Sequence, residues 1–222
     1  MIRHLLQLIW NQRKQNAWLW AELLLVSVFL WFLVDYLYVM GRTYTAPLGF
    51  DIRHTYSIVI SSLSERSPDY IPKEKRERPD GVHLLTALDR IRTYPGVESA
   101  CLTDGGMPYY MGSRNLVWRI DTLQVPCRYA FVTPEFFDVF RIYDKDGKTA
   151  SLKWAIEDNN SIVISADVET MNPGLSLLGQ KAYRGNVTDE IEETIRGISV
   201  PIRRHEYTKA EPNVYSCLLY TS

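Results

Sequence analysis

The sequence predicts an α+β protein in which a single N-terminal transmembrane helix is followed by a mixed α+β extracytoplasmic domain. The first observation is an apolar run of 23 residues from Ala17 to Val39, AWLWAELLLVSVFLWFLVDYLYV. The second is that shorter strand-like and helix-like segments follow Met40 without strict βαβ alternation. No later run is long enough to cross a bilayer. The remainder is therefore expected to fold as one domain of ordinary size.

The apolar run has the length and the flanks of a permanent anchor. As a helix rising ~1.5 Å per residue it spans roughly 34 Å, which covers a hydrocarbon core of ~30 Å. Glu22 and Asp35 interrupt the run only near its ends, where a carboxylate reaches the headgroups. The alternative is a buried helix of a soluble core, but Trp and Tyr cluster toward the two ends, as in interfacial belts. A membrane helix is favoured.

Basic residues predict the orientation of this helix. Arg3, Arg13 and Lys14 precede it, whereas Arg42 alone follows it closely. Because cytoplasmic flanks carry the excess of Lys and Arg, the N-terminus is expected in the cytoplasm and the domain outside. The expected parts are a cytoplasmic segment at 1–16, the transmembrane helix at 17–39, the extracytoplasmic domain at 40–216 and a non-native tail at 217–222.

Local patterns predict the elements of the domain. Runs rich in β-branched and aromatic residues predict strands at 56–61, 97–103, 115–121, 125–132, 161–165, 181–184 and 193–203. Helical spacing predicts helices at 81–94, 134–140 and from 166. The first of these helices is expected to rest on the sheet, and Thr133 is expected to cap the second, whose three Phe form core. The charged stretch 64–79 is expected to be an exposed excursion.

Composition excludes several classes of function. The net charge is −1, so the chain offers no basic surface for nucleic acid. No two of its three cysteines lie at zinc-ligand spacing, which makes a structural zinc site implausible. A disulfide between Cys101 and Cys127 and a pair of buried free thiols both fit the spacing, and buried thiols are favoured.

Motifs of catalysis and of cofactor binding are absent from the sequence. It contains no GxSxG, no GxxxxGK[ST] and no GxGxxG. Asp144, Asp146 and Gly147 resemble a calcium loop, but Ile142 and Lys153 occupy positions at which that loop needs acids, so a polar turn is expected. We expect no enzyme activity, and we predict no catalytic, cofactor-binding or metal-ligating residue.

One loop is a candidate contact site for a substrate or a partner protein. It contains Met107, Tyr109, Tyr110 and Met111 between glycines that exclude regular structure. Met and Tyr side chains adapt to irregular partners. Ordinary packing of the same four side chains is the favoured interpretation, and contact with a substrate or partner is the alternative.

Several weak motifs follow one another in a recognisable order. They are Gly49-Phe50-Asp51, LDRIRTYPGVESA (Leu88 to Ala100), YAFVTPEFFDVFRI (Tyr129 to Ile142), NSIVIS (Asn160 to Ser165), Leu178-Gly179-Gln180-Lys181 and the stretch from Ile198 to Tyr215. In this order the chain resembles the N-terminal part of an ABC transporter permease of the MacB and FtsX type. The resemblance covers the first transmembrane helix and a MacB-like periplasmic core domain.

This resemblance implies a transport function. Such a permease acts as a dimer and couples a separate cytoplasmic ABC ATPase to periplasmic domain motion, exporting or extracting a substrate. The chain would lie in the inner membrane, with its main domain in the periplasm and ATP hydrolysis on the other subunit. Family members have three further transmembrane helices, so the sequence is expected to be an N-terminal fragment with exposed edge strands. The alternative is a single-pass membrane-anchored extracytoplasmic binding or sensor module.

Overall fold

The structure is a computed structural model that divides into two compact units, Met1–Ala46 and Pro47–Ser222. The residues that it describes are 3, 7, 10, 14, 17–61, 63–72, 75, 80–110, 112, 114–158, 160–184 and 190–218.

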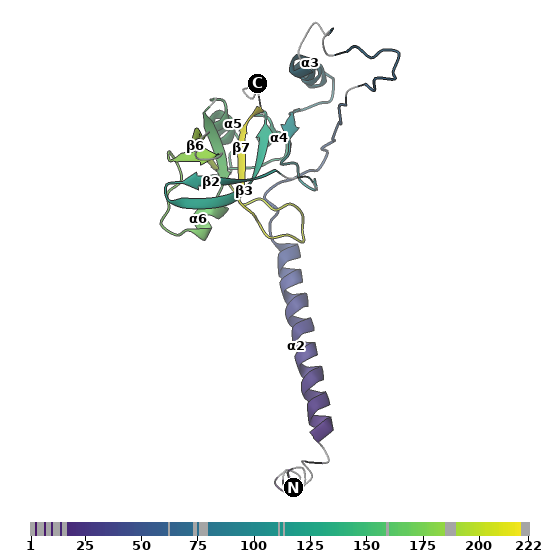
Figure 1. Ribbon diagram of the computed structural model, residues 1–222, viewed down its shortest axis with the longest axis vertical. Coiled ribbons are helices and arrows are strands. Elements are labelled where there is room, and N and C mark those ends of the chain that lie inside the picture. Colours follow the sequence, from purple (N-terminus) through teal and green to yellow (C-terminus); the bar gives the residue numbers. More distant parts are fainter. Residues whose placement is uncertain are drawn as a thin grey trace. The chain divides into compact units, whose positions relative to one another are not determined.

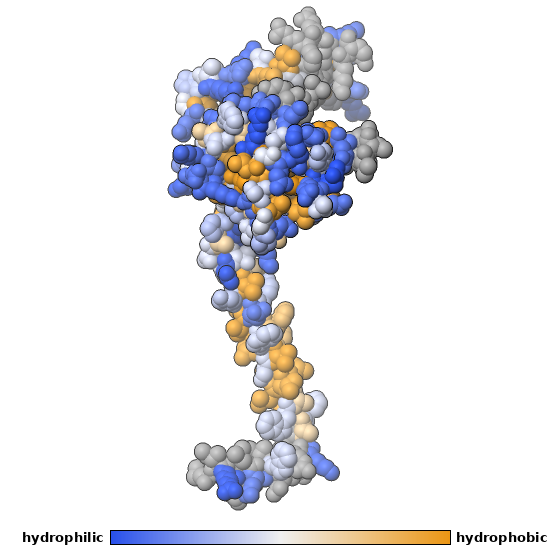
Figure 2. All heavy atoms as spheres, turned by 90° about the vertical axis from the view of Figure 1, so that its left-hand side faces the viewer, coloured by the Kyte–Doolittle hydropathy of each residue, from blue (hydrophilic) through white to orange (hydrophobic). Residues whose placement is uncertain are grey.

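The first unit contains one long helix, α2 (Ala17–Thr45). It begins where the sequence predicts and continues six residues past the expected end at Val39. It ends just before Ala46, where the following Pro47 disfavours the helical conformation. None of its residues is buried, and apolar side chains cover much of its length (Figure 2). By length and composition α2 is a candidate membrane-spanning helix.

The second unit is built on one mixed sheet, which has seven strands among the described residues (Figure 1). The strands are β1 (Thr103–Asp104), β2 (Arg114–Ile120), β3 (Leu123–Val132), β4 (Ser161–Ser165), β5 (Lys181–Arg184), β6 (Ile191–Ser199) and β7 (Asn213–Cys217). Their order is β1-β3-β2-β5-β6-β4-β7, and β3 also pairs with β7. The extra pairing closes six strands into a ring. The pairs β3–β7 and β4–β6 are parallel.

Two core clusters lie on the two faces of this ring. The first takes buried side chains from every ring strand and so fills the interior. The second lies between the outer face and the helices α4 (Phe136–Val139) and α5 (Ala150–Ile156). Strand β3 serves both clusters, because Tyr129 joins the first and Ala130 the second. Helix α6 (Asp167–Met171) contributes Val168 to the interior.

The predicted α+β class is confirmed, and several elements occur as expected. Strands β2 and β3 lie where the sequence predicts strands and pair as an antiparallel hairpin, and β4, α6 and β5 also lie where the sequence places them. The three Phe of the 134–140 segment are buried. Its predicted cap is wrong, since Thr133 instead accepts a hydrogen bond from the backbone N–H of Leu102 at 3.1 Å. Helix α5 and strand β7 were not anticipated as separate elements.

Two predicted strands are wrong. The segment 56–61 forms no strand, and 97–103 pairs only at its end, through β1 with the last residues of β3. Both segments have strand-like composition, but a strand forms only where a neighbour completes its hydrogen bonds. The first segment is also exposed, with Tyr56 and Val59 each 86% accessible.

Helix α3 (Asp80–Arg92) confirms the helix predicted at 81–94 but not its position on the sheet. Leu88 is buried, whereas Val82, Leu84 and Leu85 remain 36–39% exposed. An ion pair between Arg92 and Glu135, 2.6 Å long, holds the end of the helix to the domain. The apolar face of α3 therefore stays accessible.

Candidate partner-contact site

The loop that follows β1 runs closely against strand β3. Gly105 and Gly106 both have positive φ, 86° and 71°, which favours glycine. A Cβ atom at Gly106 would lie 2.6 Å from the Cβ of Ala130, so only glycine fits there without movement. This close approach places the loop over the outer face of β3 and beside Tyr215.

The structure describes three of the four residues that the sequence groups in this loop. Tyr109 and Tyr110 are 41% and 48% exposed. Met107 packs against the second core cluster instead. Met111 lies outside the described residues. Among the described residues of this group, the two tyrosine rings are thus the ones presented to solvent.

Tyr109 is held from three directions. Its backbone N–H donates to the carbonyl of Arg204 at 3.1 Å. Its ring meets the ring of Phe50 edge to face, with centroids 5.8 Å apart. Its hydroxyl donates to the carboxylate of Glu206, and this hydrogen bond lowers the pKa of Glu206. A ring fixed in this way can contact a ligand with little loss of conformational entropy.

The loop between β6 and β7 supplies the other side of the site. Arg203 is buried there, and its guanidinium donates to the carbonyls of Thr208, at 2.7 Å from Nε, and of Glu206. Its backbone N–H donates to the carbonyl of Leu48 at 3.0 Å. Arg203 therefore fixes this loop to the segment that follows α2.

Two arginines in this part of the domain were missed from the sequence, and the carbonyl of one of them, Arg204, accepts the backbone N–H of Tyr109. Arg128 is on the outer face of β3, two residues before Ala130 and on the same side of the strand. Arg204 follows Arg203 in the β6–β7 loop. Both are half-buried, and the Nε atom of each is enclosed without a hydrogen-bond partner. Burial, and next the charge of Arg204, lower the pKa of Arg128. No spacing signal links two arginines separated by 76 positions, so sequence reasoning had no means to pair them.

Neither a metal centre nor a reactive thiol is found among the described residues. Among the described residues, no group of three or more His, Cys, Asp or Glu side chains is placed to hold a metal ion. The three cysteines are free thiols. Burial raises the pKa of both Cys101 and Cys127 to about 12, so these thiols stay protonated and poorly nucleophilic at neutral pH.

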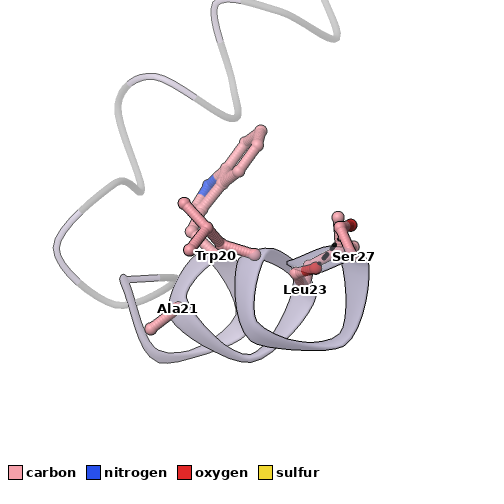
Figure 3. A pocket seen from close by; sticks show the side chains of 5 residues that line it. Trp20, Ala21, Leu23 and Ser27 are labelled. Carbon is pink, nitrogen blue, oxygen red and sulfur yellow. Dashed lines mark hydrogen bonds between the residues drawn. The ribbon is translucent and has the colours of Figure 1, made fainter. Parts of the chain in front are cut away.

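A hollow on α2 does not add to this site. It is lined by Trp20, Ala21, Leu23, Leu24 and Ser27 (Figure 3). The hydroxyl of Ser27 is occupied, because it donates to the carbonyl of Leu23 at 2.7 Å. These side chains lie on the candidate membrane span, where lipid is the expected neighbour.

Asp144 behaves as the predicted polar turn. Its carboxylate accepts the backbone N–H groups of Asp146 and Lys148, each at 2.8 Å, and the hydroxyl of Ser151. These hydrogen bonds lower the pKa of Asp144. The carboxylate oxygens that would coordinate a cation are therefore already hydrogen-bonded within the chain.

No protein-family model matches the chain, and no curated protein matches it significantly. Solved structures show a likeness. One is a domain of a protein assigned as a permease from Porphyromonas gingivalis, with 20% identity and a TM-score of 0.45, covering 62% of this chain and 52% of that one. Another is the periplasmic region of MacB from Actinobacillus actinomycetemcomitans, with 11% identity and a TM-score of 0.42, covering 61% and 55%.

A third is the extracellular domain of the noncanonic ABC-type transporter YknZ from Gram-positive bacteria, with 12% identity and a TM-score of 0.41, covering 60% of this chain and 62% of that one. The matched region thus spans between 52% and 62% of each solved structure. All three belong to permease or transporter proteins, the class that the sequence resembles. The identities and TM-scores are low, and the function proposed below depends on the motifs and geometry of this chain.

Proposed function

We propose that the chain is a permease subunit of an ABC transporter of the MacB and FtsX type. It couples a separate cytoplasmic ATPase to motion of a periplasmic domain, for export or extraction of a substrate. The observation that carries the proposal is that the sequence motifs of the resemblance fall, in the same order along the chain, on successive elements of one domain. YAFVTPEFFDVFRI runs from β3 into α4, NSIVIS ends in β4, and Leu178 to Lys181 turns into β5.

The connection between helix and domain suits a mechanical role. Only Ala46 and Pro47 separate the last residue of α2 from Leu48, whose carbonyl accepts the Arg203 N–H at 3.0 Å. Asp51 then donates its N–H to the carbonyl of Phe140 at 2.9 Å. A short link with early backbone hydrogen bonds transmits displacement better than a long flexible linker does.

The proposed topology follows the positive-inside rule. Residues 1–16 are cytoplasmic, the membrane helix includes 17–39, and the domain from residue 40 is periplasmic. Residues 217–222 are a non-native tail in this proposal, although Cys217 completes strand β7. The permease functions as a dimer in the inner membrane. Of the four candidate residues, Tyr109 and Tyr110 contact the substrate or a partner protein in this proposal, whereas Met107 packs against the core. Met111 lies outside the described residues.

The test is the DNA sequence of the source locus across and beyond codon 222. The proposal expects a reading frame that continues into three more apolar helices, next to a gene for an ABC ATPase. Co-expression of the two products should then give a complex whose ATPase activity is lost when the Walker A lysine of the ATPase is replaced. A stop codon after Ser222 without such a neighbour would contradict the permease.

That contrary result would favour a single-pass membrane-anchored binding or sensor module. One observation speaks for this second candidate, namely the exposed and rigidly held ring of Tyr109, which is suited to binding and needs no ATPase. A sensor would be expressed as a complete chain and would act without an ATPase.

A further inference from the structure

Arg128 and Arg204 lie in the same region of the domain, because Arg128 pairs with Asn213 at the end of the β6–β7 loop and Arg203 bridges to Ala210 within that loop. Arg128 and Arg204 are each half-buried, and neither takes part in an ion pair among the described residues. Their backbones, in contrast, are well fixed. The N–H of Arg128 donates to the carbonyl of Pro212 at 2.8 Å, and the carbonyl of Arg204 accepts from Tyr109. The guanidinium groups are therefore carried by rigid segments.

Nearby acids compensate this charge only in part. Burial of Arg128 and the charge of Arg204 lower the pKa of Arg128, while Tyr215 and Glu211 oppose that shift with smaller effects. The carboxylate of Glu206 already accepts the hydroxyl of Tyr109. The neighbourhood of the two arginines thus keeps an excess of positive charge.

Placing two guanidinium groups close together in a partly buried position costs free energy unless an anion binds between them. Two like charges in a partly desolvated place repel, and each guanidinium loses hydration. A phosphate group relieves both costs, because its oxygens accept charge-assisted hydrogen bonds from two planar guanidiniums. Carboxylates of the chain do not occupy this position among the described residues, so the anion is expected to come from another molecule.

We propose that Arg128 and Arg204 bind the phosphate of an anionic phospholipid, with Tyr109 and Tyr110 against its glycerol and upper acyl region. The loop that carries Arg204 is hydrogen-bonded to Leu48, three residues after the end of α2. Because only two residues link α2 to Leu48, this loop is tethered close to the end of the proposed membrane helix. Phospholipid is the most concentrated phosphate at a bilayer surface. Tyrosine is also enriched at that surface.

Native mass spectrometry of the full chain tests this proposal. The protein is released from micelles containing phosphatidylglycerol and phosphatidylcholine in equal amounts, and the retained lipids are counted. The wild type is expected to retain phosphatidylglycerol preferentially. Arg128→Gln and Arg204→Gln should each lower that retention about tenfold, the effect of one lost charge-assisted contact. Arg90→Gln, at an exposed position of α3, is the matched control and should retain the lipid.

Inorganic phosphate separates the two sources of this chemistry. Added phosphate is expected to displace phosphatidylglycerol from the wild type but to change nothing in the Gln variants. Equal retention by Arg128→Gln, Arg204→Gln and Arg90→Gln would overturn the proposal. Binding of free phosphate without any preference for phosphatidylglycerol would also overturn it. The assay needs no ATPase, so its failure leaves the permease proposal unaffected.

Folding of the variants is checked by thermal unfolding. The Gln variants remove like-charge repulsion and are expected to unfold at the wild-type temperature or above. If either Gln variant unfolds at a lower temperature than wild type, Arg204→Lys is used in its place. This variant keeps the positive charge but loses the planar guanidinium group that binds two phosphate oxygens. A several-fold loss of phosphatidylglycerol by Arg204→Lys is the expected result, and wild-type retention would contradict the proposal.

Discussion

At the residue scale, one glycine of β6 is fixed by the space around it. A Cβ atom at Gly197 would lie 2.8 Å from Cγ2 of Val163 and 2.9 Å from Cβ of Ala155. Both contacts come from a packed core between the sheet and α5. Because such a core cannot give way cheaply, glycine here allows α5 to approach the sheet.

Gly197→Ala is expected to destabilise the domain by about 1–3 kcal/mol, the usual cost of overpacking. The free energy of unfolding, measured by urea denaturation of the full chain in detergent, checks this value. Gly81→Ala is the control, since its Cβ would meet nothing within 4 Å. Alanine in helix α3 should be neutral or stabilise by about 0.5–1 kcal/mol. Equal losses in both variants would contradict the packing argument.

Two adjacent glutamates of β6 differ in their surroundings and hence in their pKa shifts. Glu193 is buried beside Arg184, with Nε and Oε2 3.1 Å apart, and it accepts the hydroxyl of Ser216. Burial is the largest effect and raises the pKa of Glu193. Glu192 is exposed, and its hydrogen bonds with Lys181 and Tyr183 lower its pKa.

The two shifts predict opposite pH dependences. A raised pKa means that the folded chain holds the Glu193 proton more tightly than the unfolded chain does, so wild type loses stability relative to Glu193→Gln as pH rises above 4.5. The lowered pKa of Glu192 gives wild type an advantage over Glu192→Gln that is present above 4.5 and is lost as pH falls below it. Urea denaturation between pH 3 and pH 7 measures both differences. Slopes of the same sign would show the assigned shifts to be wrong.

At the element scale, the sequence predicts where many strands lie more readily than which strands pair with one another. The β2–β3 hairpin is recognisable because its partners are close in sequence and alternate clearly. The ring closes instead through pairs such as Arg128 with Asn213, and no local pattern encodes so distant a partner. The 56–61 segment shows the converse case, since strand propensity without a partner gave a wrong prediction.

Only part of the candidate site could be predicted from the sequence. Exposure of Tyr109 and Tyr110 followed from a loop whose glycines and proline exclude regular structure. The inward position of Met107 did not, because it depends on the close approach that Gly106 allows to β3. Arg128 and Arg204 meet only after the ring has closed, so their pairing is a property of the tertiary fold.

The exposed segment before α3 carries a prediction of its own. Val59 is 86% accessible, with Tyr56 and Ile58 also exposed nearby. Val59→Asp is expected to leave the free energy of unfolding within about 0.5 kcal/mol of wild type. It should also reduce self-association, because a charge interrupts an unpaired apolar strand-like segment. Urea denaturation and light scattering measure the two effects, and a large loss of stability would show that Val59 is packed.

At the scale of the whole molecule, the apolar helix and the domain must lie in different environments. Helix α2 has no buried residue, whereas the domain encloses two apolar clusters of its own. The domain buries its apolar side chains in its own core, whereas those of α2 stay exposed, as expected of a helix that lies in lipid. This division makes the topology testable with single cysteines.

Single introduced cysteines at Lys14 and Lys209 should report opposite sides of the membrane. Both positions are exposed. Cys101 and Cys127 give little background, because burial raises their pKa from 9.0 to about 12 and so lowers their thiolate fraction about a thousandfold. The third native thiol, Cys217, is buried. In intact spheroplasts a membrane-impermeant maleimide should label Lys209→Cys but not Lys14→Cys, and lysis should expose both. Labelling of Lys14→Cys alone before lysis would reverse the orientation, and labelling of both would exclude a spanning helix.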